Sequence, residues 1–286
     1  MSSPIFKNTR EVSWNVIIAA VVAFVGTSLL NHYVLAEHKI FFNLFDITKG
    51  LIHPILLYDL ISLVIICFII FGWGHLKLRE VGFLKTALKP AMLFFLCFWL
   101  MAQVSFALLS WVRAGTLEWN IAWEQGWAGV IGLLIAHLFG TAIYEELAFR
   151  GFMLPQLFLK LGGSPENQTR RHVVYAILVS QIVFSLIHIP VLVFQGTNFG
   201  IIIARLGICL FLGIIMALLY LRTCNLFLIV GIHALIDTNT SLFSGIEDSV
   251  EHGVYVFLMI LLLILWPIFR IRNPWIAERR ISEITR

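Results

Sequence analysis

Three short stretches of the sequence combine acidic, basic and imidazole side chains at four-residue spacing within apolar surroundings. They are EELAFR at 145–150, FSLIH at 184–188 and HALID at 233–237. Carboxylates and imidazoles can transfer protons, bind metals or stabilise a developing negative charge. In lipid such groups are costly and tend to mark function or tight pairing. The candidates for chemistry therefore come from these stretches.

The first stretch divides into a pair and a separate acid. Glu146 and Arg150 are four residues apart, so on a helix they share a face and can pair. Glu145 points about 100° away from Glu146 and has no obvious local partner, which leaves it available for chemistry. The alternative is that both acids neutralise Arg150 and only stabilise the helix.

The other two stretches allow several interpretations. Phe184 and His188 share a helix face, and a lone histidine in an apolar helix is more often a structural residue. His233 and Asp237 form another pair with a four-residue spacing. It can be a histidine oriented by a carboxylate, two metal ligands, or two groups that bind an oxyanion. Structural hydrogen bonding between helices is the competing interpretation.

The elements that must position these residues are membrane helices. Of the 286 residues, 60% are hydrophobic and 13% are charged, and the mean hydropathy is +0.93, far from a soluble composition. We expect an all-α polytopic bundle forming a single integral membrane domain over 1–286. Runs of ~20 apolar residues predict about eight spans. They lie near 13–35, 51–73, 91–112, 128–160, 173–194, 199–221, 224–243 and 253–270.

The distribution of Lys and Arg predicts the orientation of the bundle. With both termini in the cytosol, 15 of the 20 basic residues fall on the cytosolic side and three on the other, as the positive-inside rule requires. The net charge of +4 then reflects cytosolic loops, and no nucleic-acid partner is expected. We predict that the loop 74–90 is cytosolic and that the loop 244–252 is external.

Depth along the helices brings the three stretches together. Glu145, His188 and His233 lie 11 to 15 residues from the cytosolic ends of their spans, which is ~17–22 Å at ~1.5 Å per residue. We therefore expect a single intramembrane site, with the motif-bearing spans 128–243 as its core. Further ionisable residues within predicted spans that have no assigned role include Asp59, His137 and Arg205.

Taken in order, the three stretches resemble the signature of the CPBP family, which is EExxxR, FxxxH and HxxxN or HxxxD on successive membrane helices. This family contains type II CAAX prenyl endopeptidases, Abi proteins and bacteriocin-processing relatives. The resemblance covers about residues 128–243 and implies glutamate-dependent peptide hydrolysis within the membrane. It implies that Glu145 is the general base and acts with His188 on a water molecule.

The same resemblance implies roles for the remaining motif residues. His233 and Asp237 would stabilise the oxyanion of the tetrahedral intermediate, while Glu146 and Arg150 brace the helix and Phe184 supports the site. Many members have Asn at the position of Asp237. An ionised Asp cannot donate a hydrogen bond and would repel an oxyanion. Asp237 would therefore have to be protonated or instead orient His233, and we expect the latter.

We expect no cofactor, with zinc as the alternative. The family is often labelled a metalloprotease family, and Glu145, His188 and His233 resemble a zinc ligand set. However, HExxH is absent from the sequence, and water activated by a carboxylate and an imidazole needs no metal.

The predicted function is that of a multi-pass intramembrane endopeptidase, in the plasma (inner) membrane if the source is bacterial. Its substrate would be a membrane-associated peptide or protein, prenylated or a bacteriocin or pheromone precursor. Two alternatives remain: a non-catalytic Abi-like immunity or scaffold protein, and a proton-coupled transporter. A transporter predicts inverted repeats, and the sequence shows none.

Overall fold

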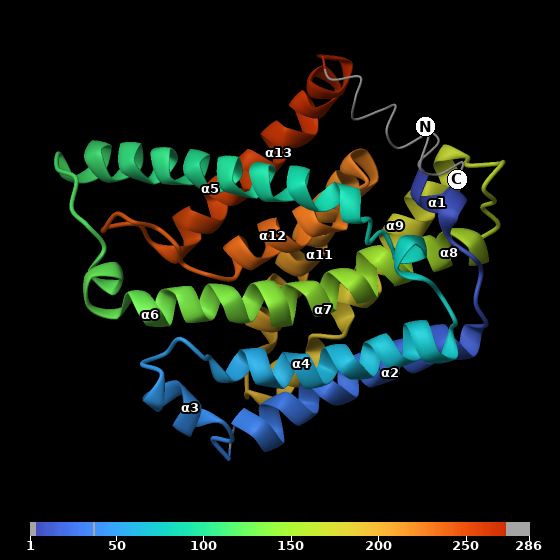
Figure 1. Ribbon diagram of the computed structural model, residues 1–286, viewed down its shortest axis with the longest axis horizontal. Coiled ribbons are helices and arrows are strands. Elements are labelled where there is room, and N and C mark those ends of the chain that lie inside the picture. The colour runs from blue at the N-terminus through green and yellow to red at the C-terminus, as the bar shows by residue number, and fades with distance from the viewer. Residues whose placement is uncertain (1–3, 37, 273–286) are drawn as a thin grey trace.

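The computed structural model describes residues 4–36 and 38–272, which form a bundle of helices without a strand (Figure 1). The helices that build the bundle are α2 (Trp14–Leu30), α4 (Pro54–Cys67), α5 (Lys85–Ala114), α6 (Ile121–Ala136), α7 (Ala142–Glu146), α8 (Leu154–Lys160), α9 (Arg170–Leu186), α11 (Phe199–Thr223), α12 (Leu226–Ile236) and α13 (Asp248–Arg272). Short helices α1 (Pro4–Asn8), α3 (Phe42–Ile47) and α10 (Ile189–Phe194) lie at its edges, with a 3₁₀ turn η3 (Leu78–Val81) before α5.

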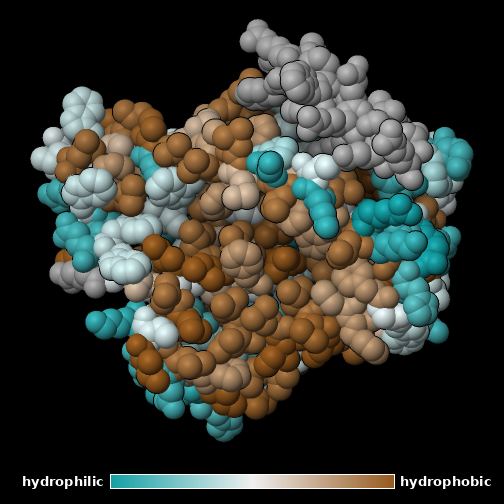
Figure 2. Space-filling view, viewed as in Figure 1, coloured by the Kyte–Doolittle hydropathy of each residue, from teal (hydrophilic) through white to brown (hydrophobic). Residues whose placement is uncertain are grey.

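The described residues contain seven helical segments that are long and apolar enough to cross a membrane. Figure 2 shows apolar side chains over the middle of the molecule and polar ones gathered towards its two ends. The outward-facing apolar residues include Val64, Phe68, Val104 and Val112, each at least 60% exposed. A folded soluble protein does not present such a surface, so the chain is an integral membrane protein with a polytopic helical fold.

The predicted fourth span, 128–160, is one continuous helical path over Gly126–Lys160, and Gly126 kinks the helix that begins at Ile121. Two π-helical turns interrupt its α-helical geometry: η4 (His137–Thr141) and η5 (Leu147–Met153). They bracket α7, which carries the two adjacent glutamates. π-Helical turns inside α-helices occur frequently at functional sites. Two further π-helical turns, η1 (Asn31–Ala36) and η2 (Phe68–Trp73), end the helices that begin with α2 and α4.

A tight hairpin between α11 and α12 sets the position of the third motif, residues 233–237, along the bundle. Cys224 takes a left-handed conformation (φ 49°) and ends α11, and its backbone N–H bonds the carbonyl of Tyr220. Asn225 then caps α12 by accepting a hydrogen bond from the backbone N–H of Leu228. Helix α12 packs against both α5 and α7, so its buried face lies directly beside the glutamates.

The expected helix 173–194 is broken, which corrects its predicted continuity, although the rings of Phe184 and His188 stay in contact. Helix α9 ends at Leu186, and α10 begins at Ile189. The cause is Pro190, which has no N–H to bond the carbonyl of Leu186 four residues earlier. His188 therefore lies at the junction of two helices.

The predicted span 224–243 is also too long, because α12 ends at Ile236. The segment that follows has no regular structure, and its backbone is held by hydrogen bonds to other helices. Gln103 of α5 accepts from Leu242 N and donates to the carbonyl of Thr240, while Glu251 accepts from Thr240 N. Irregular backbone at membrane depth is tolerated only where such partners exist.

The orientation in the membrane stays a prediction. The C-terminal tail beyond Arg272, which contributes basic residues to the expected cytosolic side, lies outside the described residues.

Candidate active site

The predicted convergence of the three motifs is confirmed by a cavity of about 150 Å³ between α7, α9, α11 and α12. Glu145, His188 and His233 all line it, although they come from three separate parts of the chain. The full lining consists of Glu145, Phe184, His188, Cys209, Leu212, Met216, His233, Ile236 and Asp237. All four predicted catalytic residues, Asp237 included, therefore meet in one place, surrounded mainly by apolar side chains.

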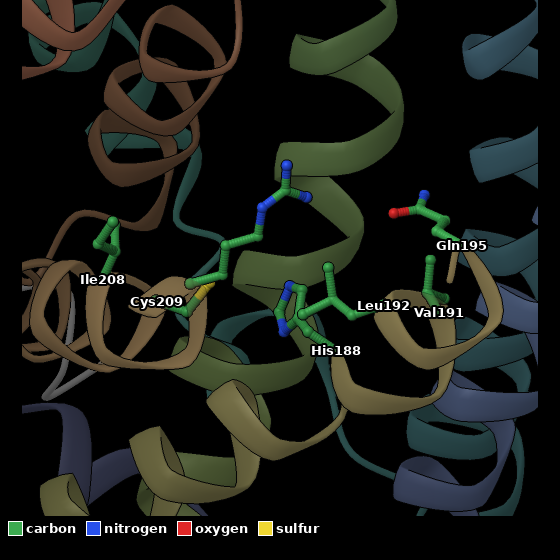
Figure 3. Close-up of a pocket in the computed structure, with 7 residues that line it drawn as sticks. His188, Val191, Leu192, Gln195, Ile208 and Cys209 are labelled. Carbon is green, nitrogen blue, oxygen red and sulfur yellow. The ribbon is translucent and has the colours of Figure 1, made fainter. Parts of the chain in front are cut away.

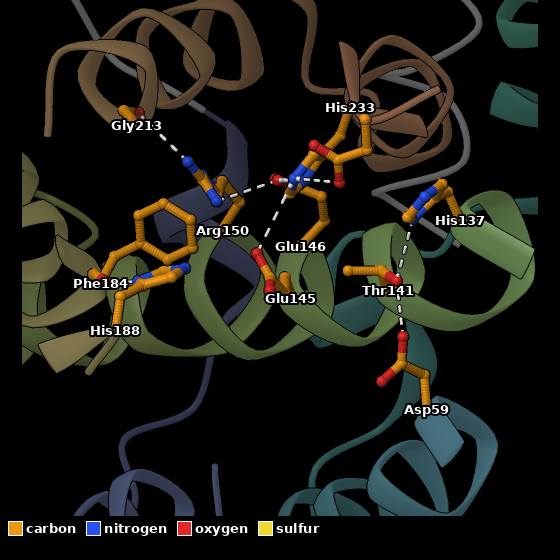
Figure 4. Close-up of polar contacts among 11 residues, drawn as sticks. Asp59, His137, Thr141, Glu145, Glu146, Arg150, Phe184, His188, Gly213 and His233 are labelled. Atoms are coloured by element: carbon orange, nitrogen blue, oxygen red, sulfur yellow. Dashed lines mark hydrogen bonds and ion pairs between the residues drawn. The ribbon is translucent and has the colours of Figure 1, made fainter. Parts of the chain in front are cut away.

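The predicted pair of Glu146 and Arg150 is present and fully buried. Arg150 Nη1 lies 2.9 Å from Glu146 Oε1, and neither side chain is exposed. The guanidinium also donates to the carbonyl of Gly213 on α11 (3.4 Å) and lies over the ring of Phe184 at 4.6 Å from its centroid. A cation in an apolar interior is tolerated because it is paired in this way, so this pair ties α7 to α9 and α11 (Figure 4).

Glu146 makes a second contact that sequence reasoning missed. His233 Nδ1 lies 2.7 Å from the same Oε1 atom that binds Arg150. The two residues are 87 positions apart, and no local spacing indicates such a bond. Glu146 therefore fixes the ring of His233 as well as the helix. The other carboxylate oxygen of Glu146 is buried and has no hydrogen-bond partner among the described residues.

Two further carboxylates face the opposite nitrogen of His233. Asp237 Oδ2 lies 3.3 Å from His233 Nε2, and Glu145 Oε2 lies 3.8 Å from it. The side chain of Glu145 is 13% exposed and that of Asp237 is 30% exposed. The predicted contact between Asp237 and His233 is present, and the Glu145 carboxylate is near this ring without being hydrogen-bonded to it.

His188 has a defined ring orientation despite its position between helices. Its Nδ1 lies 2.8 Å from the carbonyl oxygen of Phe184. A carbonyl can only accept, so Nδ1 carries the proton, and in the neutral ring Nε2 is then an acceptor. The ring of Phe184 packs edge-on against that of His188, with centroids 5.1 Å apart. Phe184 thus contacts both Arg150 and His188, in keeping with its expected supporting place.

A second cavity of about 300 Å³ adjoins the first and shares His188 and Cys209 with it. Val191, Leu192 and Ile208 give it a mainly apolar wall. Figure 3 shows these side chains, from α10 and α11, around the opening beside His188. Arg205, which had no assigned role, also lines this cavity.

Glu145, His188 and His233, the ligands of the alternative zinc site, line one cavity. Within residues 4–36 and 38–272, no group of three or more His, Cys, Asp or Glu side chains is arranged to hold a metal ion. Both ring nitrogens of His233 already face carboxylates, at 2.7 and 3.3 Å.

Comparison with known proteins gives one match. Residues 126–239 match a family model described as type II CAAX prenyl endopeptidase Rce1-like. Searches of curated proteins and of solved structures gave no match. The matched segment contains all three motifs and every motif residue of the cavity. Through residues 126–239, the chain is similar to the Rce1-like type II CAAX prenyl endopeptidases.

Proposed function

We propose that the protein is an intramembrane endopeptidase in which Glu145 activates a water molecule to hydrolyse a peptide bond. The observation that supports this most strongly is the convergence of Glu145, His188 and His233 on one cavity within the bundle. The match of residues 126–239 to a protease family model supports the same class of reaction.

The first step needs a base and a second group that holds the water. Glu145 carries a carboxylate with no close hydrogen bond to His233, so it is available to take the proton. Nε2 of His188, whose Nδ1 is committed to the carbonyl of Phe184, is oriented to help hold the water. The oxygen attacks the substrate carbonyl as its proton passes to Glu145. Glu145 then returns the proton to the departing amine as the C–N bond breaks.

Charge on the tetrahedral intermediate needs a donor that is already in place. His233 is held through Nδ1 by Glu146, so its Nε2 has a fixed direction towards the cavity. We assign to Nε2–H the hydrogen bond to the oxyanion. Preorganised donors of this kind are worth about 100- to 1,000-fold in rate.

Asp237 lies on the same side of the His233 ring as the proposed oxyanion. We assign to it the role of orienting the Nε2–H group before substrate binds. Its negative charge works against an oxyanion at the same position, so the charge must be offset by other groups.

The adjoining cavity is the proposed binding place for substrate next to the scissile bond. Its wall beside His188 is mainly apolar, which suits apolar side chains of a membrane-associated peptide. A prenylated peptide, a bacteriocin leader and a pheromone precursor are the substrate types we propose. The observations favour none of these three over the others.

The test is cleavage of a panel of prenylated and unmodified peptides by the purified protein in lipid nanodiscs. We expect wild-type protein to cleave at least one peptide and the Glu145→Gln variant to cleave none. Wild-type protein that folds and cleaves nothing would favour the scaffold alternative. Equal cleavage by both proteins would rule out Glu145 as the base.

Metal content is measured on the same samples, because the proposed mechanism has no metal step. We expect full activity in metal-free protein and no inhibition by phenanthroline. Stoichiometric zinc that tracks activity through chelation and restoration, and that is lost in His233→Ala, would overturn this part of the proposal.

A further inference from the structure

Arg205 carries a charge inside a membrane span and has no partner in the folded chain. It lies on α11, a candidate span over Phe199–Thr223, about 9 Å along the helix axis from the first residue. Its guanidinium forms no ion pair or hydrogen bond with any residue that the structure describes. A charge within a span is costly and tends to mark a functional site, so the partner of Arg205 needs to be identified.

Arg150 shows how this protein accommodates an arginine that stabilises the fold. Its side chain is fully buried, lies 2.9 Å from Glu146 Oε1 and donates to the carbonyl of Gly213. Arg205, by contrast, is exposed. A group from outside the chain can therefore reach its guanidinium.

The position of Arg205 on α11 relates it to the catalytic cavity. Leu212 lines that cavity, Arg205 lines the adjoining one, and Cys209 lines both. Along the helix axis Leu212 and Arg205 are ~10 Å apart, and an extended peptide advances ~3.3 Å per residue. Figure 3 shows His188 and Cys209 where the adjoining cavity meets the catalytic one. A peptide that occupies both cavities thus brings a group roughly two to four residues from the scissile bond to Arg205.

The chemistry of the adjoining cavity fits a short peptide segment with a negative charge. Val191, Leu192 and Ile208 provide apolar contacts, and Arg205 and Gln195 are the polar side chains whose groups can donate. None of the residues that line this cavity is acidic. A guanidinium binds a carboxylate through two parallel N–H···O bonds. The volume of about 300 Å³ is at the lower end for ligand pockets, which limits the segment to a few residues.

We propose that Arg205 is a specificity-determining residue that binds a carboxylate of the substrate, roughly two to four residues from the scissile bond. The inference rests on the proposed function, because it takes the adjoining cavity as part of the substrate-binding site. The carboxylate is either the free C-terminal group of the peptide or the side chain of an Asp or Glu. Both present the same planar anion to the guanidinium.

Matched peptides test for the carboxylate and identify its source. A peptide that the protein cleaves is remade to end two, three or four residues beyond the cut, each as a C-terminal acid and as an amide. Longer amidated peptides carry a single Asp or Asn at the same distances on either side of the cut. We expect wild-type protein to favour one acid over its amide, or one Asp over its Asn, about tenfold in kcat/KM, mainly through KM. Equal cleavage within every pair would overturn the proposal.

Variants of Arg205 assign the preference to this side chain. Arg205→Gln should reduce the preference to less than about twofold and leave kcat for the amide or Asn peptide unchanged. Arg205→Glu should reverse it, so that a Lys peptide is cleaved better than the Asp peptide. Because Arg205 is exposed, we expect wild-type melting temperatures for both variants. A preference of wild-type size in Arg205→Gln would overturn the proposal.

The matched control is Arg113→Gln, which removes the same charge elsewhere. Arg113 is exposed in the last turn of α5 and lines neither cavity. We expect it to keep the wild-type preference, and its loss there would mean a general effect of net charge and would contradict the assignment to Arg205. All assays are repeated in phosphate-free detergent. If Arg205→Gln slows both peptides of a pair equally in phospholipid nanodiscs but neither in detergent, Arg205 binds lipid phosphate and the proposal is wrong.

Binding to the Glu145→Gln variant separates this inference from the proposed function. Fluorescence anisotropy measures the Kd of labelled acid and amide or Asp and Asn peptides without cleavage. We expect the preferred peptide of the pair to bind about tenfold more tightly, and no difference in Kd would overturn the role of Arg205. Such a difference in Kd, found together with cleavage by Glu145→Gln, would show that the proposed function has failed while the carboxylate site stands.

Discussion

Two polar clusters lie about one helical turn apart on the same membrane helix, but different forces hold them. In the first, Glu146 is shared between Arg150 and His233, with the ion pair fully buried. In the second, a hydroxyl of Thr141 links His137 to Asp59 without a direct ion pair. The first cluster lies within the family-matched segment, whereas Asp59 comes from a helix outside it.

Because different forces hold the two clusters, we expect the first to stabilise the fold and the second to position side chains. A buried ion pair that loses one partner leaves an uncompensated charge in an apolar interior, which destabilises the whole fold. A lost hydroxyl bridge breaks hydrogen bonds without separating an ion pair, which destabilises less but lets a side chain move. We therefore expect substitutions in the charged cluster to unfold the protein and those in the hydroxyl-linked cluster to change its kinetics.

Substitutions of the two adjacent glutamates should give the largest effects, on activity at Glu145 and on stability at Glu146. Glu145→Gln should lower the cleavage rate about 100- to 10,000-fold, as loss of a general base does, with thermal unfolding in detergent unchanged. Peptide cleavage and a melting curve on the same preparation measure both quantities. A destabilised Glu145→Gln protein would mean that Glu145 serves the fold.

Glu146→Gln should lower the free energy of unfolding by roughly 3–5 kcal/mol, because Arg150 stays buried without its counter-ion. The measurement is thermal or denaturant unfolding in detergent, with Glu145→Gln as the matched control. Some loss of activity should accompany it, since His233 also loses its Nδ1 partner. A Glu146→Gln protein as stable as wild type would show that the pair contributes nothing to the fold.

His233 and Asp237 should differ in their sensitivity to substitution. His233→Ala removes the oxyanion donor and should reduce the rate about 100- to 1,000-fold. Asp237→Asn keeps a hydrogen-bonding group of the same size and should retain a rate within about tenfold of wild type, while Asp237→Ala should resemble His233→Ala. Steady-state kinetics on the three variants gives the comparison, and equal losses for Asn and Ala at 237 would contradict it.

The last prediction concerns the orientation of the two clusters relative to the membrane. It is tested by cysteine labelling, and the substitutions used for labelling should leave activity unchanged. Single cysteines in 74–90 should react from the cytosolic side and those in 244–252 from the opposite side, in a background without the four native cysteines. This result would place the hydroxyl-linked cluster nearer the external surface than Glu145. Reaction of 244–252 from the cytosol would contradict the predicted topology.

Much of this site could be predicted from the sequence because spacing and depth are local quantities. A four-residue interval predicts the Glu146–Arg150 pair, and counting along apolar runs predicts that Glu145, His188 and His233 converge. The sequence also contained signals for the two helices whose predicted bounds were wrong. Pro190 marks the break after α9, and the polar residues after Asp237 mark the end of α12.

The remaining contacts could not be predicted because they depend on how the helices pack. Nothing local to Glu146 shows that its oxygen also binds His233, a residue of another helix. Asp59 and His137 stood out as ionisable residues in apolar runs, but only the approach of α4 at Gly140 brings Asp59 to Thr141. The regular spacing of His137, Thr141 and Glu145 was the one available signal.

The most direct test of the central claim is a single turnover in ¹⁸O-water with the purified protein and a cleavable peptide. Mass spectrometry measures the label in the new C-terminal carboxylate of the product and in the side chain of Glu145. If Glu145 is a general base, the product carries one ¹⁸O atom and Glu145 carries none. Label in the Glu145 carboxylate with an unlabelled product would show that Glu145 attacks the peptide bond itself, and would contradict water activation.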